Sequence, residues 1–189
     1  MKRAGLIRVR GLGRDIKRRG AHYNERVLAL KYVYVLALAV WLGGMVILGA
    51  VVAPTTFQVL QATEPTTGRL LGGAVFGAVL ARFHLVAYGA GALALLALAA
   101  MALLGPRPRG FAVRSGIVAL MLLVALYSGF VVLTEVDAIQ QEVGGLSSSL
   151  PAHDPRRVRF DELHQLSTQL MMANIIGALV LLYWEARET

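Results

Sequence analysis

The sequence contains no cysteine, and this absence removes several kinds of chemistry at once. The chain has no disulfide, no thiolate metal ligand and no thiol redox centre. It also lacks the HExxH, P-loop, GxSxG and CxxC motifs. Because no nucleophile stands beside a base, we do not expect an enzyme.

Charge is scarce over most of the chain. Charged residues make up only 16% of the 189 residues, and the mean hydropathy is +0.62. A helix needs about 20 largely apolar residues to cross the hydrocarbon core. Four blocks have no Lys, Arg, Asp or Glu over such a length: 32–63, 83–106, 115–134 and 163–184. We therefore predict an all-α polytopic membrane protein, a four-transmembrane-helix bundle with spans at about 30–53, 83–104, 113–134 and 163–184.

Basic residues gather at one end of the predicted bundle. Residues 1–31 hold ten of the nineteen Lys and Arg residues, and the link 105–114 adds three arginines. Segment 135–162 instead carries six acidic residues against three arginines. The positive-inside rule places the N-terminus and the link in the cytoplasm, and four spans return the C-terminus there. We expect a multi-pass protein of a bacterial inner (plasma) membrane.

The basic N-terminal arm, residues 1–26, is distinct from the membrane domain at 27–187. We expect the arm to be disordered or to form a surface helix. Each Lys or Arg near an anionic surface contributes about 1 kcal/mol, so residues 1–31 are predicted to contact anionic lipid head groups. Tyr23 is the arm's one aromatic residue, so we expect no nucleic-acid binding.

Proline and glycine predict where the helices break. We expect Pro54 to end or kink the first span, and Gly105 with Pro106 to stop the second. Residues 68–81 are predicted to form an outer helical piece that contains a GxxxG pair at Gly73 and Gly77.

Titratable residues mark one layer at the outer, non-cytoplasmic end. Counting about twenty residues from the cytoplasmic ends of the spans places five of them, and also Pro54, at one depth: Arg82, His84, Glu135, Asp137 and His164. Ionisable residues at membrane depth are costly, so each needs a reason. For Arg82 we expect an interfacial ion pair with an acidic residue.

The last span carries a polar stripe beneath this layer. At 100° per residue, His164, Ser167 and Asn174 share one face, which should turn toward the bundle. Asn174 lies near mid-membrane and needs a partner there, such as Ser128. Tyr88 lies beneath His84 on the second span. His84 and His164 are the candidate ligand or metal residues, and the dipeptides FH at 83–84 and LH at 163–164 hint at an internal repeat.

Two segments carry a resemblance to a known family. WLGGMVILGAVVAPTTFQVL (41–60) resembles the first span of the TMEM205-like proteins, formerly the DUF4149 family. RVRFDELHQLSTQLMMANIIGAL (157–179) resembles their last span, which enters through an F-x-x-L-H-x-x-S pattern. Here the pattern residues are Phe160, Leu163, His164 and Ser167.

The resemblance implies a four-span membrane protein, with no established activity for bacterial members. A eukaryotic relative is linked to resistance to a platinum drug, which suggests the handling of metals or small molecules. The architecture is more distantly similar to CopD copper-resistance proteins and HemJ-type haem proteins. Those usually carry a histidine in the first span where this chain has Tyr34, which counts against an intact haem or copper site.

Three hypotheses of function follow. The first is a protein that binds or passes a small ligand or metal ion at an outer-face site around His84 and His164, with the neighbouring acids. The second is a b-type haem protein with His84 and His164 as the axial pair. The third is a membrane scaffold that assembles with itself or with partner membrane proteins.

Overall fold

A computed structural model describes residues 3–104, 108–144, 146–147 and 150–188, with side chains from Glu25 onward. Its elements are six α-helices and two π-helices: α1 Arg3–Ile47, η1 Leu48–Val52, α2 Ala53–Thr63, α3 Gly68–Leu104, α4 Phe111–Tyr127, η2 Ser128–Val132, α5 Leu133–Val143 and α6 Pro155–Arg187. The predicted stop at Gly105 and Pro106 lies outside the described residues.

Four helical rods in the described chain are long and apolar enough to cross a membrane. They cover residues 25–63, 68–104, 111–143 and 155–187, which confirms the prediction of an all-α chain with four helices able to span a membrane. Each rod is longer than the roughly 20 residues that a bilayer core requires. Large apolar side chains cover their outside, including Leu85, Leu96, Leu103, Leu120 and Phe130. A water-soluble monomer rarely exposes apolar surface on this scale, whereas lipid accepts it.

Of the two expectations for Pro54, an end or a kink of the first span, the end does not occur. The π-helix η1 precedes this residue, and the chain continues as α2 to Thr63. Pro54 stands in the first turn of α2, immediately after a stretch in which the regular hydrogen-bond ladder already changes. The prolyl ring therefore fits a helix that continues. Residues 68–81 likewise form the start of the continuous helix α3.

The two hairpins of the fold form a tandem repeat with a constant offset of 80 residues. Each begins with an α-helix, passes through a five-residue π-helix and a further α-helix, and returns by a long α-helix. The two π-helices, LGAVV and SGFVV, match at this offset, as do His84 and His164. Because each repeat crosses twice, both copies have the same orientation across the bundle, as in parallel repeats of membrane proteins.

Burial follows the same offset. Seven pairs are buried in both copies: Tyr34 and Arg114, Leu38 and Val118, Trp41 and Met121, Met45 and Ala125, Ala94 and Asn174, Leu98 and Ala178, and Met101 and Leu181. The core is thus built twice from equivalent helix positions. The weak hint of two dipeptides was the visible part of a repeat that runs through both hairpins.

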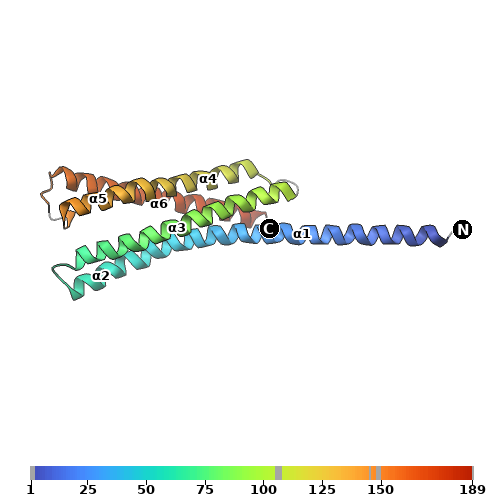
Figure 1. The fold of residues 1–189 in the computed structure, drawn as a ribbon, viewed down its shortest axis with the longest axis horizontal. Helices are drawn as coiled ribbons and strands as arrows, with labels where there is room; N and C mark the ends of the chain where they lie inside the picture. The colour runs from blue at the N-terminus through green and yellow to red at the C-terminus, as the bar shows by residue number, and fades with distance from the viewer. Residues whose placement is uncertain (1–2, 105–107, 145, 148–149, 189) are drawn as a thin grey trace.

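The four rods pack around a ring in the order α1, α3, α4, α6. Figure 1 shows them close together near the C-terminus, while α2 with α3 diverges from α5 with α6 at the opposite end. We call these the terminal end, which holds the start of α4 and the end of α6, and the loop end, which holds the connections 64–67 and 144–154. The core at the terminal end includes Leu38, Leu98, Val118 and Ala178, each with no exposed surface.

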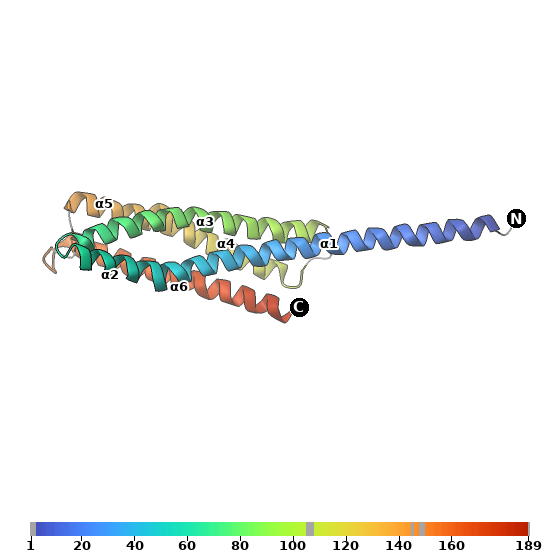
Figure 2. The ribbon, with the colours of Figure 1, turned by 90° about the horizontal axis from the view of Figure 1, so that it is seen from below.

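The arm is helical over residues 3–26, where α1 continues past the bundle. Figure 1 and Figure 2, at right angles, both show this part of α1 beyond the other helices. Of the two expectations for the arm, helix is the one that the backbone adopts.

Helix α6 begins at a charged cap. The carboxylate of Asp154 accepts hydrogen bonds from the backbone N–H and the guanidinium of Arg156, at 2.9 to 3.1 Å. These bonds, the side-chain ones first, lower the pKa of Asp154 to about 2. Because the pKa is depressed on folding, the cap stabilises α6 above pH 3.8, the ordinary value for Asp, and this contribution is lost as the pH falls toward 2.

The cap gives a direct test by titration. In Arg156→Ala we expect the pKa of Asp154 to rise from about 2 toward 3.8, with part of the shift retained because the backbone N–H of residue 156 remains. Carbon-detected NMR of the Asp154 carboxyl measures both values. An unchanged midpoint in Arg156→Ala would contradict the assignment.

Two adjacent glycines give a matched test of the packing between α1 and α3. A Cβ on Gly44 would overlap the ring of Phe83, whereas a Cβ on Gly43 would meet nothing within 4 Å. We expect Gly44→Ala to destabilise the fold by about 1–3 kcal/mol through overpacking. Gly43→Ala should be neutral or stabilising, since alanine is the better helix former. Thermal unfolding in detergent compares them, and equal midpoints would show that Phe83 moves freely.

Candidate functional site: a cavity between the two repeats

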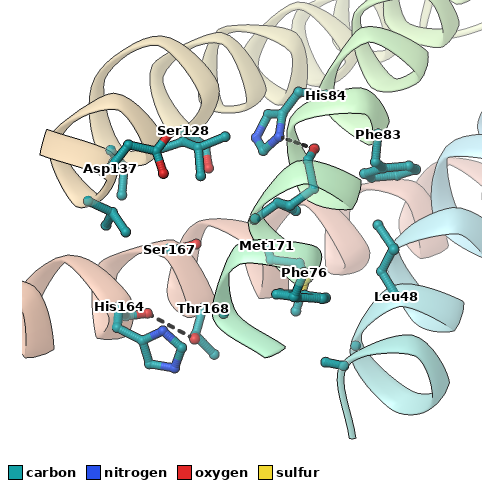
Figure 3. A pocket seen from close by; sticks show the side chains of 18 of the residues that line it. Leu48, Phe76, Phe83, His84, Ser128, Asp137, His164, Ser167, Thr168 and Met171 are labelled. Carbon is teal, nitrogen blue, oxygen red and sulfur yellow. Dashed lines mark hydrogen bonds between the residues drawn. The ribbon is translucent and has the colours of Figure 1, made fainter. Parts of the chain in front are cut away.

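A cavity of about 860 Å³ lies between the repeats toward the loop end. All four rods line it, and Figure 3 shows side chains from several of them. Apolar side chains form most of the wall, notably Trp41, Met45, Phe57, Phe76, Phe83 and Met171. The volume is that of a site for a drug-sized molecule. Gly73 and Gly77, the predicted GxxxG pair, border this space.

Charged lining residues belong to the extensions at the loop end. Arg69 lies near the start of α3, Asp137 on α5, and Asp161 near the start of α6. Farther along the rods toward the terminal end, the polar lining is uncharged amide, hydroxyl and imidazole, from Asn174, Ser128 and His84. The cavity therefore has a charged mouth and a hydrogen-bonding, mostly apolar interior.

His84 faces this interior from α3. The ring is 9% exposed, and its Nδ1 lies 2.9 Å from the carbonyl oxygen of Leu80 (Figure 3). A carbonyl oxygen can only accept, so Nδ1 carries the hydrogen and donates it. The other ring nitrogen, Nε2, makes no hydrogen bond with any described residue. His84 therefore has one ring nitrogen available to a bound group.

Asn174 lacks the partner that the sequence led us to expect. Its side chain is 5% exposed, lines the cavity, and makes no hydrogen bond with any residue that the structure describes. Ser128, the expected partner, lines the same cavity. The amide atoms are not among the fully buried unpaired side-chain atoms, so the amide faces the open cavity, where water or a bound group can supply its hydrogen bonds.

His164 lines the cavity but is not set as a partner for His84. Its residue is exposed, and its ring stacks on Phe160 at 6.4 Å with planes 5° apart. Figure 3 shows the ring on the Thr168 side of α6, pointing away from His84. The two histidines therefore share a cavity wall without the facing geometry that an axial haem pair requires.

The described residues also fit a metal poorly. No three His, Asp or Glu side chains among them come together as a metal-binding group. Tyr34 is fully buried, and its hydroxyl makes no hydrogen bond with any described residue. No set of described ligands therefore supports a haem or a metal ion at this cavity.

Two members of the predicted outer layer lie away from the cavity. Arg82 is exposed on α3 and has no ion pair with any described residue, so the expected interfacial pair does not form. Glu135 instead pairs with Arg159, with Nε to Oε1 at 2.7 Å, and Arg159 also reaches Glu162. Sequence position predicts that these charges lie at one end of the bundle, but it does not predict which of them form ion pairs.

Tyr88 lies between the ring of His84 and the helices of the second repeat. Its ring lies 5.9 Å from the His84 ring and stacks on Phe130 at 5.6 Å, and its hydroxyl donates a long bond of 3.5 Å to the carbonyl of Ala125. A Cβ on Gly129, in η2, would overlap both Tyr88 and His84. Because Gly129 has no side chain, the backbone of η2 can lie directly against the rings of His84 and Tyr88.

Sequence analysis missed a second polar cluster, at the terminal end. The buried carboxylate of Glu185 binds Arg114 at 2.7 Å and Lys31 at 2.8 Å, and Arg114 also pairs with Glu188 at 2.6 Å. Trp184 lies against the guanidinium of Arg114, 5.2 Å from ring centroid to carbon. Arg114 was counted as a topogenic charge, yet it is 3% exposed. The available signal was that Arg114 and Glu185 directly flank two charge-free blocks at the same end.

Comparison with known proteins places the chain in a family. A family model described as "Domain of unknown function (DUF4149)" matches residues 36–144, more than half of the chain. The chain belongs to the DUF4149 family. No curated protein and no solved structure matches it. In this DUF4149 protein the match covers the first repeat from Leu36 and ends after α5, so α6 with His164 and Asn174 lies outside it.

Absence of native cysteine allows the cavity to be probed with single introduced thiols. We expect Ser167→Cys, on the cavity wall, to react with a water-soluble thiol reagent, because water in the cavity lets the thiol ionise. Leu85→Cys lies on the outer face of α3 beside His84, where lipid surrounds it. Its reaction rate should be at most about one tenth of the rate of Ser167→Cys. Mass spectrometry of membranes after timed labelling measures both rates. Equal rates would show that the cavity is dry.

Proposed function

We propose that this DUF4149 protein binds a small amphiphilic molecule in the cavity between its two repeats. The single observation that carries the proposal is the mostly apolar cavity of about 860 Å³, which Asn174 lines with an amide that makes no hydrogen bond to any described residue and which His84 also lines. Mostly apolar pockets with a few convergent polar groups are the usual form of small-molecule sites.

The lining indicates the chemistry of the ligand. Aromatic and aliphatic walls suit an apolar body. When the ring of His84 is neutral, its Nε2 accepts a hydrogen bond, while the amide of Asn174 both donates and accepts. A hydroxyl satisfies both residues without bringing a charge into the bundle, where an unpaired charge would be costly. We therefore infer a neutral ligand with an apolar body and a hydroxyl-type head.

The membrane placement of the site is part of the proposal. The chain is an integral multi-pass membrane protein. The basic residues of 1–31 favour a cytoplasmic terminal end in a bacterial inner membrane, so the cavity opens to the outer face. The same residues would hold the helical arm to anionic head groups. Kinship with TMEM205-like proteins and assembly with further membrane proteins are proposals at the same level.

Photolabelling in lipid nanodiscs tests the ligand site. The probe is hexadecanol with a diazirine in its chain, which carries the inferred hydroxyl and apolar body. We expect cross-links on the cavity faces of α3 and α6, mapped by peptide mass spectrometry. Asn174→Leu and His84→Phe should each lower the yield about tenfold, because loss of one hydrogen bond at a buried site is worth about 1.4 kcal/mol.

Two controls make the result specific. Thr134→Val changes an exposed hydroxyl that does not line the cavity, so it should leave the yield unchanged. The matching diazirine hexadecane, which lacks the hydroxyl, should show no dependence on Asn174. Labelling spread evenly over the lipid-facing surface would contradict the proposal.

The other hypotheses predict different observations. A haem protein would show a Soret band on purification, and a metal-handling protein would lose bound metal in both His84→Ala and His164→Ala. A scaffold would copurify with a stoichiometric partner that is lost when residues 1–26 are deleted. No described contact favours these alternatives over the amphiphile site.

A further inference from the structure

The cavity is open at one end of the bundle and blocked at the other. From Asn174 to Glu185, α6 runs eleven residues, about 16 Å at 1.5 Å per residue. Ala178 and Leu181 on this stretch are 0% and 1% exposed, and they belong to one core with Leu38 and Leu98. A packed core therefore separates Asn174 from the terminal end, while the cavity extends from Asn174 toward the loop end.

The block lies on the interface between the two repeats. The repeats meet through α1 with α6 and through α3 with α4, two interfaces that the repeat makes equivalent. The buried side chains of α3 include four alanines: Ala87, Ala90, Ala94 and Ala97. Such small side chains let helix backbones approach closely, and packed helices of this kind can move by small shear displacements.

An ion pair joins the repeats across this interface. Lys31 of the first repeat and Glu185 of the second form a salt bridge, at 2.8 Å between Nζ and Oε1. The other carboxylate oxygen of Glu185 accepts from Arg114 at 2.7 Å, within the second repeat. Glu185 thus keeps a cationic partner whether or not Lys31 is bound.

This arrangement makes the inter-repeat bond cheap to break. Removing one partner of a buried pair usually costs several kcal/mol, because the other charge is left uncompensated. Here Glu185 remains paired with Arg114, and Lys31, with its side chain 29% exposed, already reaches solvent. Separation of the repeats at this end therefore strands no charge.

Each repeat also has a π-helix where its first rod changes surroundings. On the terminal side of η1 and η2 the rods contribute to both the common core and the cavity wall, whereas beyond them they line the cavity or extend toward the loops. Residues of both π-helices border the cavity, including Leu48 and Ser128. π-helical turns are frequent points of bending in long helices. Both repeats thus carry a hinge at equivalent positions.

We propose that the Lys31–Glu185 pair is a latch that closes the terminal end of a passage through the bundle. With the latch closed, the cavity is open to the loop end, as in this structure. When the latch opens, the repeats rock about η1 and η2, close the mouth, and expose Asn174 to the terminal end. This inference rests on the proposed function and extends it, since the bound amphiphile then crosses the membrane instead of only residing in it.

Thiol accessibility from the two sides of the membrane tests the latch. Ala178→Cys reports on the blocked path, and Ser167→Cys reports on the open cavity. In the native background we expect an impermeant thiol reagent to reach Ser167→Cys from the loop end and to leave Ala178→Cys unmodified. Addition of Lys31→Met should increase labelling of Ala178→Cys from the terminal end about tenfold and decrease labelling of Ser167→Cys from the loop end. Sealed vesicles of both orientations provide the two sides.

Matched variants separate the latch from general loosening. Arg159→Met breaks an ion pair that lies within the second repeat, so neither rate should change. Lys31→Arg retains the cation and should restore the native pattern. Ala94→Cys, the repeat equivalent of position 174, provides a second reporter if Ala178→Cys does not fold. Unchanged rates in Lys31→Met, or an increase at both reporters together, would overturn the latch.

The latch and the ligand site fail in different ways. If the hexadecanol probe labels the cavity while Lys31→Met leaves both accessibilities unchanged, the protein binds without passing its ligand. If accessibility shifts as expected while the probe labels no cavity residue, the rocking stands and the proposed ligand is wrong. The two measurements use separate samples and separate readouts.

Discussion

Close contact between helix backbones at the terminal end is the constraint on which the rest of the structure depends. Apolar surface gains little by leaving lipid for another helix, so association in a bilayer relies on close packing. Gly44 gives Phe83 its space, and Gly91 approaches Trp41 across the first repeat. The rods are held together there, but they are longer than this contact zone. Their loop-end extensions diverge, and the cavity occupies the space between them.

Polar groups at the two ends of the bundle differ in whether other residues of the protein bind them. At the terminal end, Glu185 is buried with Arg114 and Lys31 around it, so its charge is compensated. Toward the cavity, Asn174 is equally buried yet has no described hydrogen-bond partner. A compensated cluster holds helices in place, whereas an uncompensated amide is stable only if something else supplies its hydrogen bonds. The first is a closure, and we propose the second as a binding site.

The repeat explains the scaffold, and departures from the repeat explain the site. Asn174 replaces the equivalent Ala94, so the amide occurs once, not twice. His84 is buried at the cavity, while its equivalent His164 stands exposed on Phe160. A symmetric haem pair was a reasonable expectation from matched sequence positions. Equal register does not give equal surroundings, because the two histidines meet different neighbours.

The sequence by itself determined the class of the protein, the four spans and the depth of its polar residues. Charge-free length sets where a helix can cross a bilayer, and 1.5 Å per residue sets relative depth. Depth does not specify direction around a helix bundle, so only the tertiary structure decided which side chains meet. It paired Arg159 with Glu135, left Arg82 exposed, and buried Arg114 against Glu185. These outcomes depend on how the rods rotate and pack, and that information is spread over both repeats.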